Sequence, residues 1–169
     1  MFNDWTIFSL LNRPRGQRIA NFVPGIALQK MSEVVTDGVI WGIDHSEVMF
    51  KQASKRNRKA LLEGRVKLVL GPVSSVSSLV GQVDEVLDVN SFQFWTSPVD
   101  DLKKLRTQLA PGGMIALMHQ PRKPGSTEDE ADGTGRRFAD YLKRAGFRDI
   151  SIEKRVMKPV STVCVLARC

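Results

Sequence analysis

The sequence lacks long apolar runs, internal repeats and low-complexity tracts, and it contains only two cysteines and two histidines. A membrane-spanning helix needs about 20 consecutive apolar residues, and no stretch of the chain approaches that length. Residues 1–5 have no basic cluster and include an acid, so a secretory signal is not expected. These absences predict a cytoplasmic protein that has no membrane partner.

The two cysteines, Cys164 and Cys169, have neither the spacing of a metal site nor an obvious histidine partner. We therefore expect reduced thiols and no metal. The sequence also lacks a recognisable Ser/His/Asp set, metal-ligand cluster or phosphate-binding loop, so none of those chemistries is predicted.

Basic residues outnumber acidic residues by 25 to 18, which gives a net charge of +7. They are spread along the chain on expected helix faces and loops, a pattern that favours solvated surfaces. A nucleic-acid or anionic-ligand surface stays open as the alternative. A hydrophobic content of 42% in 169 residues is typical of one globular domain with a sizeable core.

Apolar runs of strand length alternate with segments of helical spacing over most of the chain, which predicts a parallel sheet covered on both faces. The last two strands are joined only by residues 157–159. A parallel crossover needs a dozen or more residues, so these two strands must form an antiparallel hairpin. Residues 121–135 are polar and are expected to form a loop. The expected strands are 18–22, 39–43, 65–70, 83–89, 114–118, 149–156 and 160–166, and the expected helices are 26–35, 46–62, 97–109 and 136–145.

The most informative segment is the apolar run 39–43, which ends at Asp44 and is followed by His45 and Ser46. Ser46 is placed to cap the next helix. In doubly wound sheets, an acid at the carboxyl end of the second strand binds the ribose hydroxyls of a nucleoside. A carboxylate accepts two hydrogen bonds from such a diol. The alternative is an ordinary acid that is solvated or that caps the following helix.

Several segments resemble the class I S-adenosylmethionine-dependent methyltransferases in their order and spacing, most closely the small-molecule enzymes of the ubiquinone/menaquinone type. The resemblance covers residues 24–166 and implies a Rossmann-like fold in which the acceptor and the sulfonium are held in line. The segments are Pro24-Gly25-Ile26-Ala27, Gly42-Ile43-Asp44-His45-Ser46, Gly64-Arg65-Val66, Gly71-Pro72-Val73, Val83-Asp84-Glu85-Val86 running to Asn90-Ser91, Leu109-Ala110-Pro111-Gly112-Gly113 and Ala145-Gly146-Phe147.

The resemblance implies S-adenosyl-L-methionine as the cofactor and a small molecule as the methyl acceptor. It assigns no catalytic base; His119, at the end of the fifth strand, is only a candidate base toward a hydroxyl. Of the aromatic residues Phe92, Phe94 and Trp95, we expect two in the core and one in a pocket wall. The implied cofactor-binding residues are Pro24, Gly25, Asp44, His45, Ser46, Gly71, Pro72, Val73, Asn90 and Ser91.

The first glycine motif departs from the family pattern Glu/Asp-x-Gly-x-Gly-x-Gly. Aligned on Gly25, the acid position holds Ile19, and the first two glycine positions hold Asn21 and Val23. A β-branched residue such as Val23 does not adopt a positive φ cheaply. The chain therefore resembles a methyltransferase whose N-terminal part is deleted or rearranged, with a short or missing first strand and with cofactor binding weak or lost.

Two functions remain open at this point. One is an active methyltransferase; the other is a non-catalytic, degenerate methyltransferase fold that binds a partner, with nucleic acid as a less favoured variant. We expect residues 1–17 to form a short apolar helix and a basic loop, and residues 18–169 to form the α/β domain. A short first strand would leave apolar surface exposed at the centre of the sheet, which predicts a two-fold homodimer.

Overall fold

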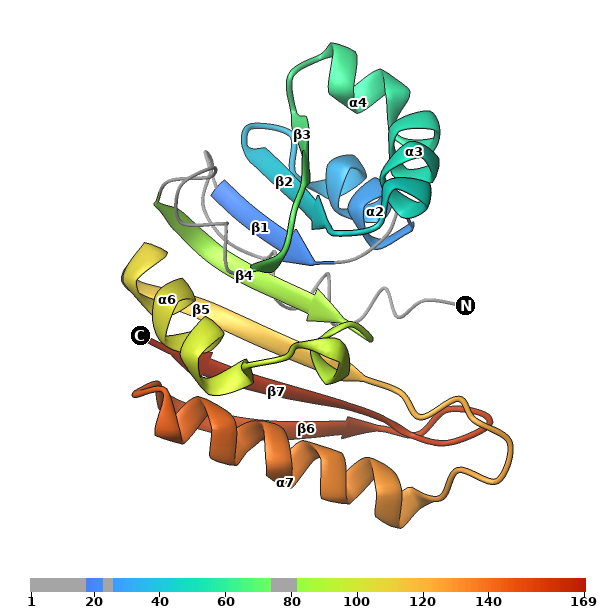
Figure 1. Cartoon of the computed structure of the whole chain (residues 1–169), viewed down its shortest axis with the longest axis vertical. Coiled ribbons are helices and arrows are strands. Elements are labelled where there is room, and N and C mark those ends of the chain that lie inside the picture. The colour runs from blue at the N-terminus through green and yellow to red at the C-terminus, as the bar shows by residue number, and fades with distance from the viewer. Residues whose placement is uncertain (1–17, 23–25, 74–81) are drawn as a thin grey trace.

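Strands from both halves of the sequence form one sheet in the computed structural model, which describes residues 18–22, 26–73 and 82–169 (Figure 1). The strands are β1 (Arg18–Phe22), β2 (Val39–Asp44), β3 (Val66–Leu70), β4 (Val83–Val89), β5 (Leu109–His119), β6 (Arg148–Arg155) and β7 (Thr162–Arg168). The helices are α2 (Ile26–Val34), α3 (Glu47–Arg56), α4 (Arg58–Leu62), α6 (Pro98–Gln108) and α7 (Glu128–Arg144), with a 3-10 turn η2 (Phe92–Phe94).

The sheet has the strand order β3-β2-β1-β4-β5-β7-β6. The first five strands in the chain pair in parallel, whereas β7 lies antiparallel between β5 and β6. The predicted fold class is confirmed, including the antiparallel C-terminal hairpin that the short connection requires.

The first strand is short, as expected, but it does not leave the centre of the sheet open. It pairs with β2 through residues 18–21 and with β4 through residues 19–22. The side chains of Ile19, Ala20 and Asn21 are at most 1% exposed. The expectation of exposed ladder groups and apolar side chains at this strand is therefore wrong for residues 18–22, because neighbours on both edges and both faces cover them.

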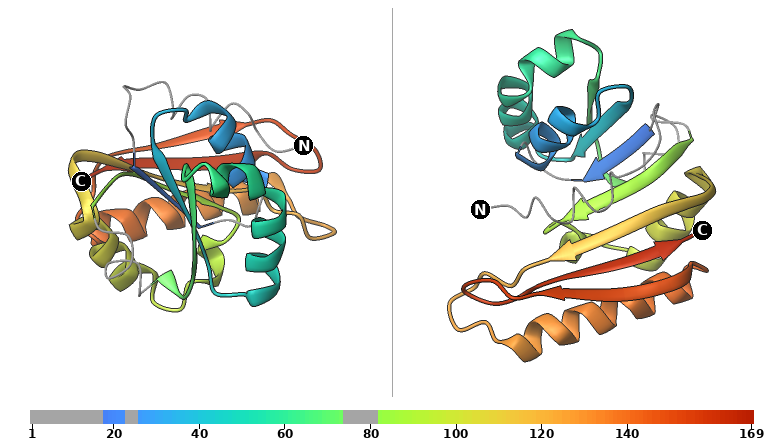
Figure 2. Two further views of the ribbon diagram at one scale, coloured as in Figure 1. Left: turned by 90° about the horizontal axis from the view of Figure 1, so that it is seen from above. Right: turned by 180° about the vertical axis from the view of Figure 1, so that it is seen from behind.

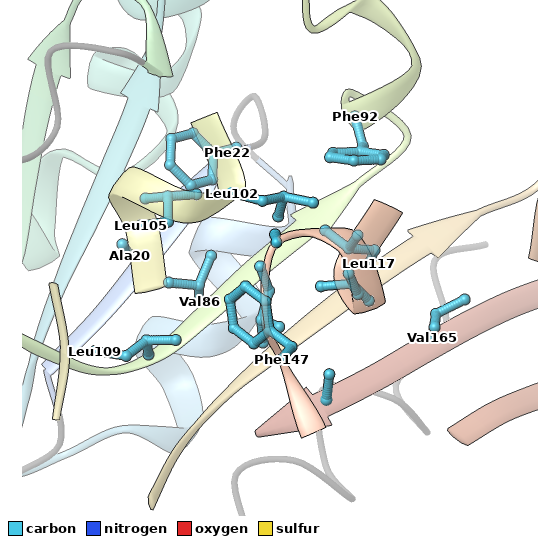
Figure 3. Close-up of a cluster of buried hydrophobic side chains, with 14 of the residues drawn as sticks. Ala20, Phe22, Val86, Phe92, Leu102, Leu105, Leu109, Leu117, Phe147 and Val165 are labelled. Carbon is cyan, nitrogen blue, oxygen red and sulfur yellow. The ribbon is translucent and has the colours of Figure 1, made fainter. Parts of the chain in front are cut away.

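Two apolar layers cover the two faces of the sheet. The alternation of side chains along β1 separates them, since Ile19 packs with residues of α2 and Ala20 packs with residues of α6 and α7. Figure 3 shows the second layer, where Phe22 and Val86 of the sheet lie near Leu102 of α6. In Figure 2, α7 lies along β6 and β7, while α2 and α3 lie by β2 and β3 at the other end of the sheet.

Helix α7 begins at Glu128, eight residues before the expected start at Arg136. The hydroxyl oxygen of Thr127 accepts a hydrogen bond from the Glu130 amide at 3.2 Å, so it caps the helix. Expecting residues 121–135 to form a loop was wrong for the part from Glu128 onward. The glycine there marks close packing, because a Cβ at Gly135 would lie 3.2 Å from Ile152 Cγ2 on β6.

The helix expected over residues 46–62 is two helices, α3 and α4, separated at Asn57. The Asn57 side chain is buried and donates to the Ala53 carbonyl oxygen at 2.9 Å. The Asn57 backbone amide also donates to this carbonyl oxygen at 2.9 Å, and the break between the helices lies at the non-helical backbone angles of Asn57, φ −102° and ψ 19°.

Both cysteine thiols are free, and Cys164 is buried. Within the described ranges, no helix is long and apolar enough to cross a membrane. The expected N-terminal helix and loop, residues 1–17, lie outside the described residues.

Candidate functional site

A cavity of about 510 Å³ opens where the carboxyl ends of β1 and β2 meet the loops that follow β3 and β4. Ligand sites in doubly wound sheets lie at this edge. Six of the residues predicted from the sequence line it: Asp44, His45, Gly71, Pro72, Val73 and Ser91. The other lining residues are Phe22, Ile43, Phe94, Trp95, Thr96, Ser97, Asp100, Asp101 and Lys104.

Asp44 is the last residue of β2, and its side chain is 18% exposed. Its Oδ1 accepts a hydrogen bond from the Ser46 amide at 2.8 Å, and its carbonyl oxygen accepts one from the Gly71 amide at 2.9 Å. The first bond orients the carboxylate, and the second fixes the loop after β3 against it. Oδ2 accepts no hydrogen bond from the described residues and so is available to a ligand at the cavity wall.

The two residues after Asp44 have different surroundings. The His45 side chain is 81% exposed, and its Nδ1 lies 4.0 Å from Asp44 Oδ1. Ser46 caps α3, as predicted, because its hydroxyl oxygen accepts from the Met49 amide at 3.4 Å. Ser46 is not part of the cavity wall, so its contribution there is to hold Asp44.

The end of β4 is organised by Asp88, which is fully buried. Its carboxylate accepts hydrogen bonds from the backbone amides of Ser91 at 3.2 Å and Phe92 at 2.8 Å, and it also contacts the Ser91 hydroxyl. Burial raises the pKa of Asp88 to about 7, against the lowering effect of these hydrogen bonds. Asp88 therefore fixes the turn that brings Ser91 to the cavity.

Asn90, predicted to contact the cofactor, lies at the other side of this turn. Its φ is +58°, a left-handed conformation that asparagine tolerates. Its Oδ1 accepts a hydrogen bond from the Gln120 amide at 2.8 Å, so the side chain joins β4 to the end of β5. Asn90 does not line the cavity.

The aromatic residues after β4 divide differently from the prediction. Phe92 is 2% exposed and packs edge-to-face on Trp95 at 4.7 Å, as a core residue. Phe94 is 74% exposed, and both Phe94 and Trp95 line the cavity. Trp95 also contacts Phe22 of β1, with ring centroids 5.2 Å apart. Two of the three aromatics therefore form the wall, rather than one.

The start of α6 supplies the part of the wall that sequence reasoning missed. Asp101 is only 9% exposed, and burial raises the pKa of its carboxyl, partly offset by Lys104. The pair Ser97-Pro98 correctly predicted a helix start, but not that the first two turns of this helix would face the cavity.

The candidate base His119 does not line the cavity. Its ring packs on Phe138 with ring centroids 6.1 Å apart, and burial lowers the pKa of His119.

The first strand contributes no carboxylate to the cavity. Ile19, at the acid position of the family motif, points into the α2 layer. Asn21 is fully buried, and the nitrogen and oxygen of its side-chain amide have no hydrogen-bond partner among the described residues. The predicted Pro24 and Gly25 lie outside the described residues. Among the residues described, no group of three or more metal-ligating side chains occurs.

The fold and site thus define a Rossmann-like protein with a cavity at the carboxyl edge of its sheet. Residues 23–117 match the methyltransferase domain family. A protein of Bacillus subtilis (strain 168) named "Uncharacterized methyltransferase YdaC" is 32% identical over 168 residues, which cover 98% of this chain and 90% of that protein. The chain belongs to the class I S-adenosylmethionine-dependent methyltransferase family.

Solved structures share the fold at low sequence identity. A SAM dependent methyltransferase from Aquifex aeolicus superposes with a TM-score of 0.76 at 18% identity, covering 99% of this chain and 89% of that one. The precorrin-6y C5,15-methyltransferase from Geobacter metallireducens GS-15 gives 0.72 at 12% identity, covering 98% and 86%. The [4+2]-cyclase SpnF gives 0.74 at 14% identity, covering 96% and 79%. Since a methyltransferase-like fold also occurs in a protein titled a cyclase, the fold alone does not fix the reaction.

Proposed function

We propose that this protein binds S-adenosyl-L-methionine in the cavity at the end of β2 and transfers its methyl group to a small-molecule acceptor. The observation that carries the proposal is the Asp44 carboxylate. One of its oxygens is held by the Ser46 amide, and the other is available at the wall of a cavity of about 510 Å³.

The residues present fit the nucleoside half of the cofactor. Asp44 Oδ2 accepts hydrogen bonds from the ribose hydroxyls. Gly71, Pro72 and Val73 form the wall beside the adenine, held in place by the bond between the Gly71 amide and the Asp44 carbonyl. Ser91, on the turn after β4, lines the same cavity and would lie beside the reactive end of the cofactor.

The chemistry supplied by the bound cofactor is a methyl group activated on a sulfonium. The protein's own contribution is positioning, since holding the two reactants in line accounts for much of such catalysis. Trp95 and Phe22 form an apolar wall that excludes water from this end of the cavity. A cavity of this size suits a small acceptor rather than a polymer.

The second candidate is a degenerate fold that has kept the cavity and lost the reaction. It is supported by Ile19, which occupies the family's acid position but is 1% exposed in the α2 layer. The cavity therefore receives no carboxylate from β1 to orient the methionine amine. In this case cofactor binding is weak or lost, and the protein acts by binding a partner or a second copy of itself.

Calorimetric titration of the full chain with S-adenosylhomocysteine distinguishes the two candidates. Saturable binding near one molecule per chain supports the methyltransferase. Absence of binding by protein with a cooperative thermal transition supports the second candidate, because the defect then lies in the site rather than in folding.

A further inference from the structure

Asp101 is an unpartnered carboxylate in the cavity wall. It is 9% exposed, and among residues 18–22, 26–73 and 82–169 its carboxylate accepts no hydrogen bond and has no ion pair within 4.0 Å. Its neighbour Asp100 differs, because the Asp100 side chain is 71% exposed and lies 3.5 Å from Lys103 Nζ. Burial raises the pKa of this carboxyl and Lys104 lowers it, so a cationic ligand group beside it would further favour its charged form.

The charge of the cavity is opposite to that of the chain. Among the described residues, its wall carries the carboxylates of Asp44, Asp100 and Asp101 and the ammonium of Lys104, whereas the whole chain has a net charge of +7. The described part of the cavity wall is therefore net negative. A phosphate-rich or carboxylate acceptor would meet like charge there, and a cation would meet complementary charge.

The same cavity also has an aromatic part of its wall. Phe94 keeps 74% of its surface exposed although it is a large apolar residue, and Trp95 lies beside it in the wall. Aromatic faces bind both apolar groups and cations. A ligand with an apolar body and a positive end would cover Phe94 and neutralise Asp101 together.

We propose that the methyl acceptor is a small aliphatic amine, bound as its ammonium ion with the nitrogen against Asp101 and its apolar body against Phe94 and Trp95. This inference rests on the proposed methyltransferase function and narrows its substrate class. Asp44, at the end of β2, remains assigned to the cofactor, which leaves Asp101 for the acceptor.

The reaction balances with the groups present. An ammonium nitrogen has no lone pair, so one proton first passes from it to the Asp101 carboxylate and then to solvent at the cavity mouth. The freed lone pair forms the N–C bond to the methyl carbon while the C–S bond of the sulfonium breaks and its electron pair stays on sulfur. The products are a methylated ammonium ion, the neutral thioether and one released proton.

The test uses three probes of one shape and different charge: benzylammonium chloride, benzyl alcohol and sodium benzoate. Each is titrated into the full chain by calorimetry, with and without S-adenosylhomocysteine. Benzylammonium is expected to bind most tightly. Asp101→Asn should weaken it about tenfold, the effect of removing a hydrogen bond to a charged group. Asp100→Asn should weaken it about twofold at most, because its exposed charge is screened.

Asp101→Glu is the control, because it changes the same side chain but keeps the negative charge. It should bind benzylammonium more tightly than Asp101→Asn does. The proposal is overturned if benzoate or benzyl alcohol binds as tightly as benzylammonium. Equal effects of the Asp100 and Asp101 substitutions, or no benzylammonium binding at millimolar concentration, overturn it too. Benzylammonium binding without S-adenosylhomocysteine binding would sink the methyltransferase proposal and leave the cation site standing.

Discussion

The hydroxyl of Ser91 lies between the carboxylate of Asp88 and the carbonyl oxygen of Phe22, 2.7 Å from the latter. A hydroxyl has one hydrogen, so it cannot donate to both oxygens at once. Both contacts are satisfied when Asp88 is protonated and donates to Ser91, which then donates to Phe22. Burial raises the pKa of Asp88 to about 7, against the lowering effect of its hydrogen bond with Ser91. Through Ser91, this buried group on β4 is joined to the end of β1 at the cavity wall.

The first prediction is that Asp88 makes the protein less stable as the pH rises. Its pKa is about 7 in the folded protein, above the ordinary value of 3.8, so the folded state binds this proton more tightly than the unfolded state does. The stabilisation is fully present below pH 4 and is lost as the pH rises through 7. The loss for this group is on the order of 4 kcal/mol.

Urea unfolding at several values between pH 4 and pH 8, for wild type and Asp88→Asn, measures this contribution. Subtracting the two curves removes the other titrating groups, and the variant should show the flatter fall. Asp140→Asn, which removes an exposed carboxylate on α7, is the matched control. Parallel curves for wild type and Asp88→Asn would contradict the assigned role of Asp88.

The second prediction concerns the nucleoside end of the cavity. Asp44→Ala should weaken S-adenosylhomocysteine binding by about 1.5–3 kcal/mol, or roughly tenfold to a hundredfold in Kd, because hydrogen bonds to a charged group are lost. Calorimetry measures the Kd, and Asp140→Asn should leave it unchanged. An unchanged Kd for Asp44→Ala would show that the ribose does not lie against Asp44.

The third prediction is that restoring the family's acid at position 19 does not repair the site. Ile19 is 1% exposed within the α2 layer and does not line the cavity. Ile19→Glu should therefore lower the free energy of unfolding by about 3–5 kcal/mol, as expected for an unpaired buried charge. The control Ile19→Val should cost about 1 kcal/mol.

Denaturant titration of both Ile19 variants decides this point. A stable Ile19→Glu protein that binds the cofactor more tightly than wild type would mean that β1 adopts a different register.

The fourth prediction concerns the contact between β2 and α2. A Cβ at Gly42 would lie 2.8 Å from Cδ2 of both Leu28 and Leu68. Leu28 is fully buried and cannot move freely, so Gly42→Ala should destabilise the protein by about 1–3 kcal/mol.

Gly133→Ala is the control for the glycine substitution. The new Cβ would meet only Arg136 Nη2, at 3.9 Å, and the residue lies within α7. It should raise stability by about 0.5–1 kcal/mol, since alanine is the better helix former. Thermal unfolding of both variants gives the comparison, and equal effects would count against the close packing of Gly42.

The fifth prediction is the homodimer, although the exposed sheet centre that first suggested it is covered in the structure. The sequence reason that remains is the set of large apolar residues Trp5, Ile7, Phe8 and Leu11 within residues 1–11, which lie outside the described residues. Light scattering after size exclusion should give twice the chain mass of 18.9 kDa. A monodisperse peak at 18.9 kDa at micromolar concentration would exclude the dimer.

The spacing of apolar residues predicted which segments are strands and which are helices. The errors were mainly in the boundaries of helices. The first turns of α7 are rich in polar residues and lack an apolar periodicity, so the sequence did not indicate where the helix begins. Ala131, Thr134 and Gly135 are nevertheless buried in this helix, which packs on β6 and β7. The break between α3 and α4 lies at the backbone angles of one residue, Asn57, which the apolar periodicity does not indicate.

The residues around the cavity also differ in whether local sequence indicates their position. Asp44 was predictable because a strand, an acid and a capped helix follow one another in the chain, and such local order fixes where the carboxylate emerges. Asn90 lies outside the cavity wall, and its side chain accepts a hydrogen bond from Gln120, a partner 30 residues away that local sequence does not indicate. Asp101 was missed because nothing near it in the sequence marks it.

The sequence by itself determined the α/β alternation, the antiparallel ending and the acid at the end of β2, because each follows from spacing and connection length within a short stretch of chain. Only the tertiary structure decided which side of α6 faces the cavity, that Ile19 points away from it, and that Asp88 holds Ser91 in its wall. These outcomes depend on how helices pack across the sheet and on which strand lies beside which. Contacts between residues far apart in the chain fix that arrangement, and local sequence patterns do not encode it.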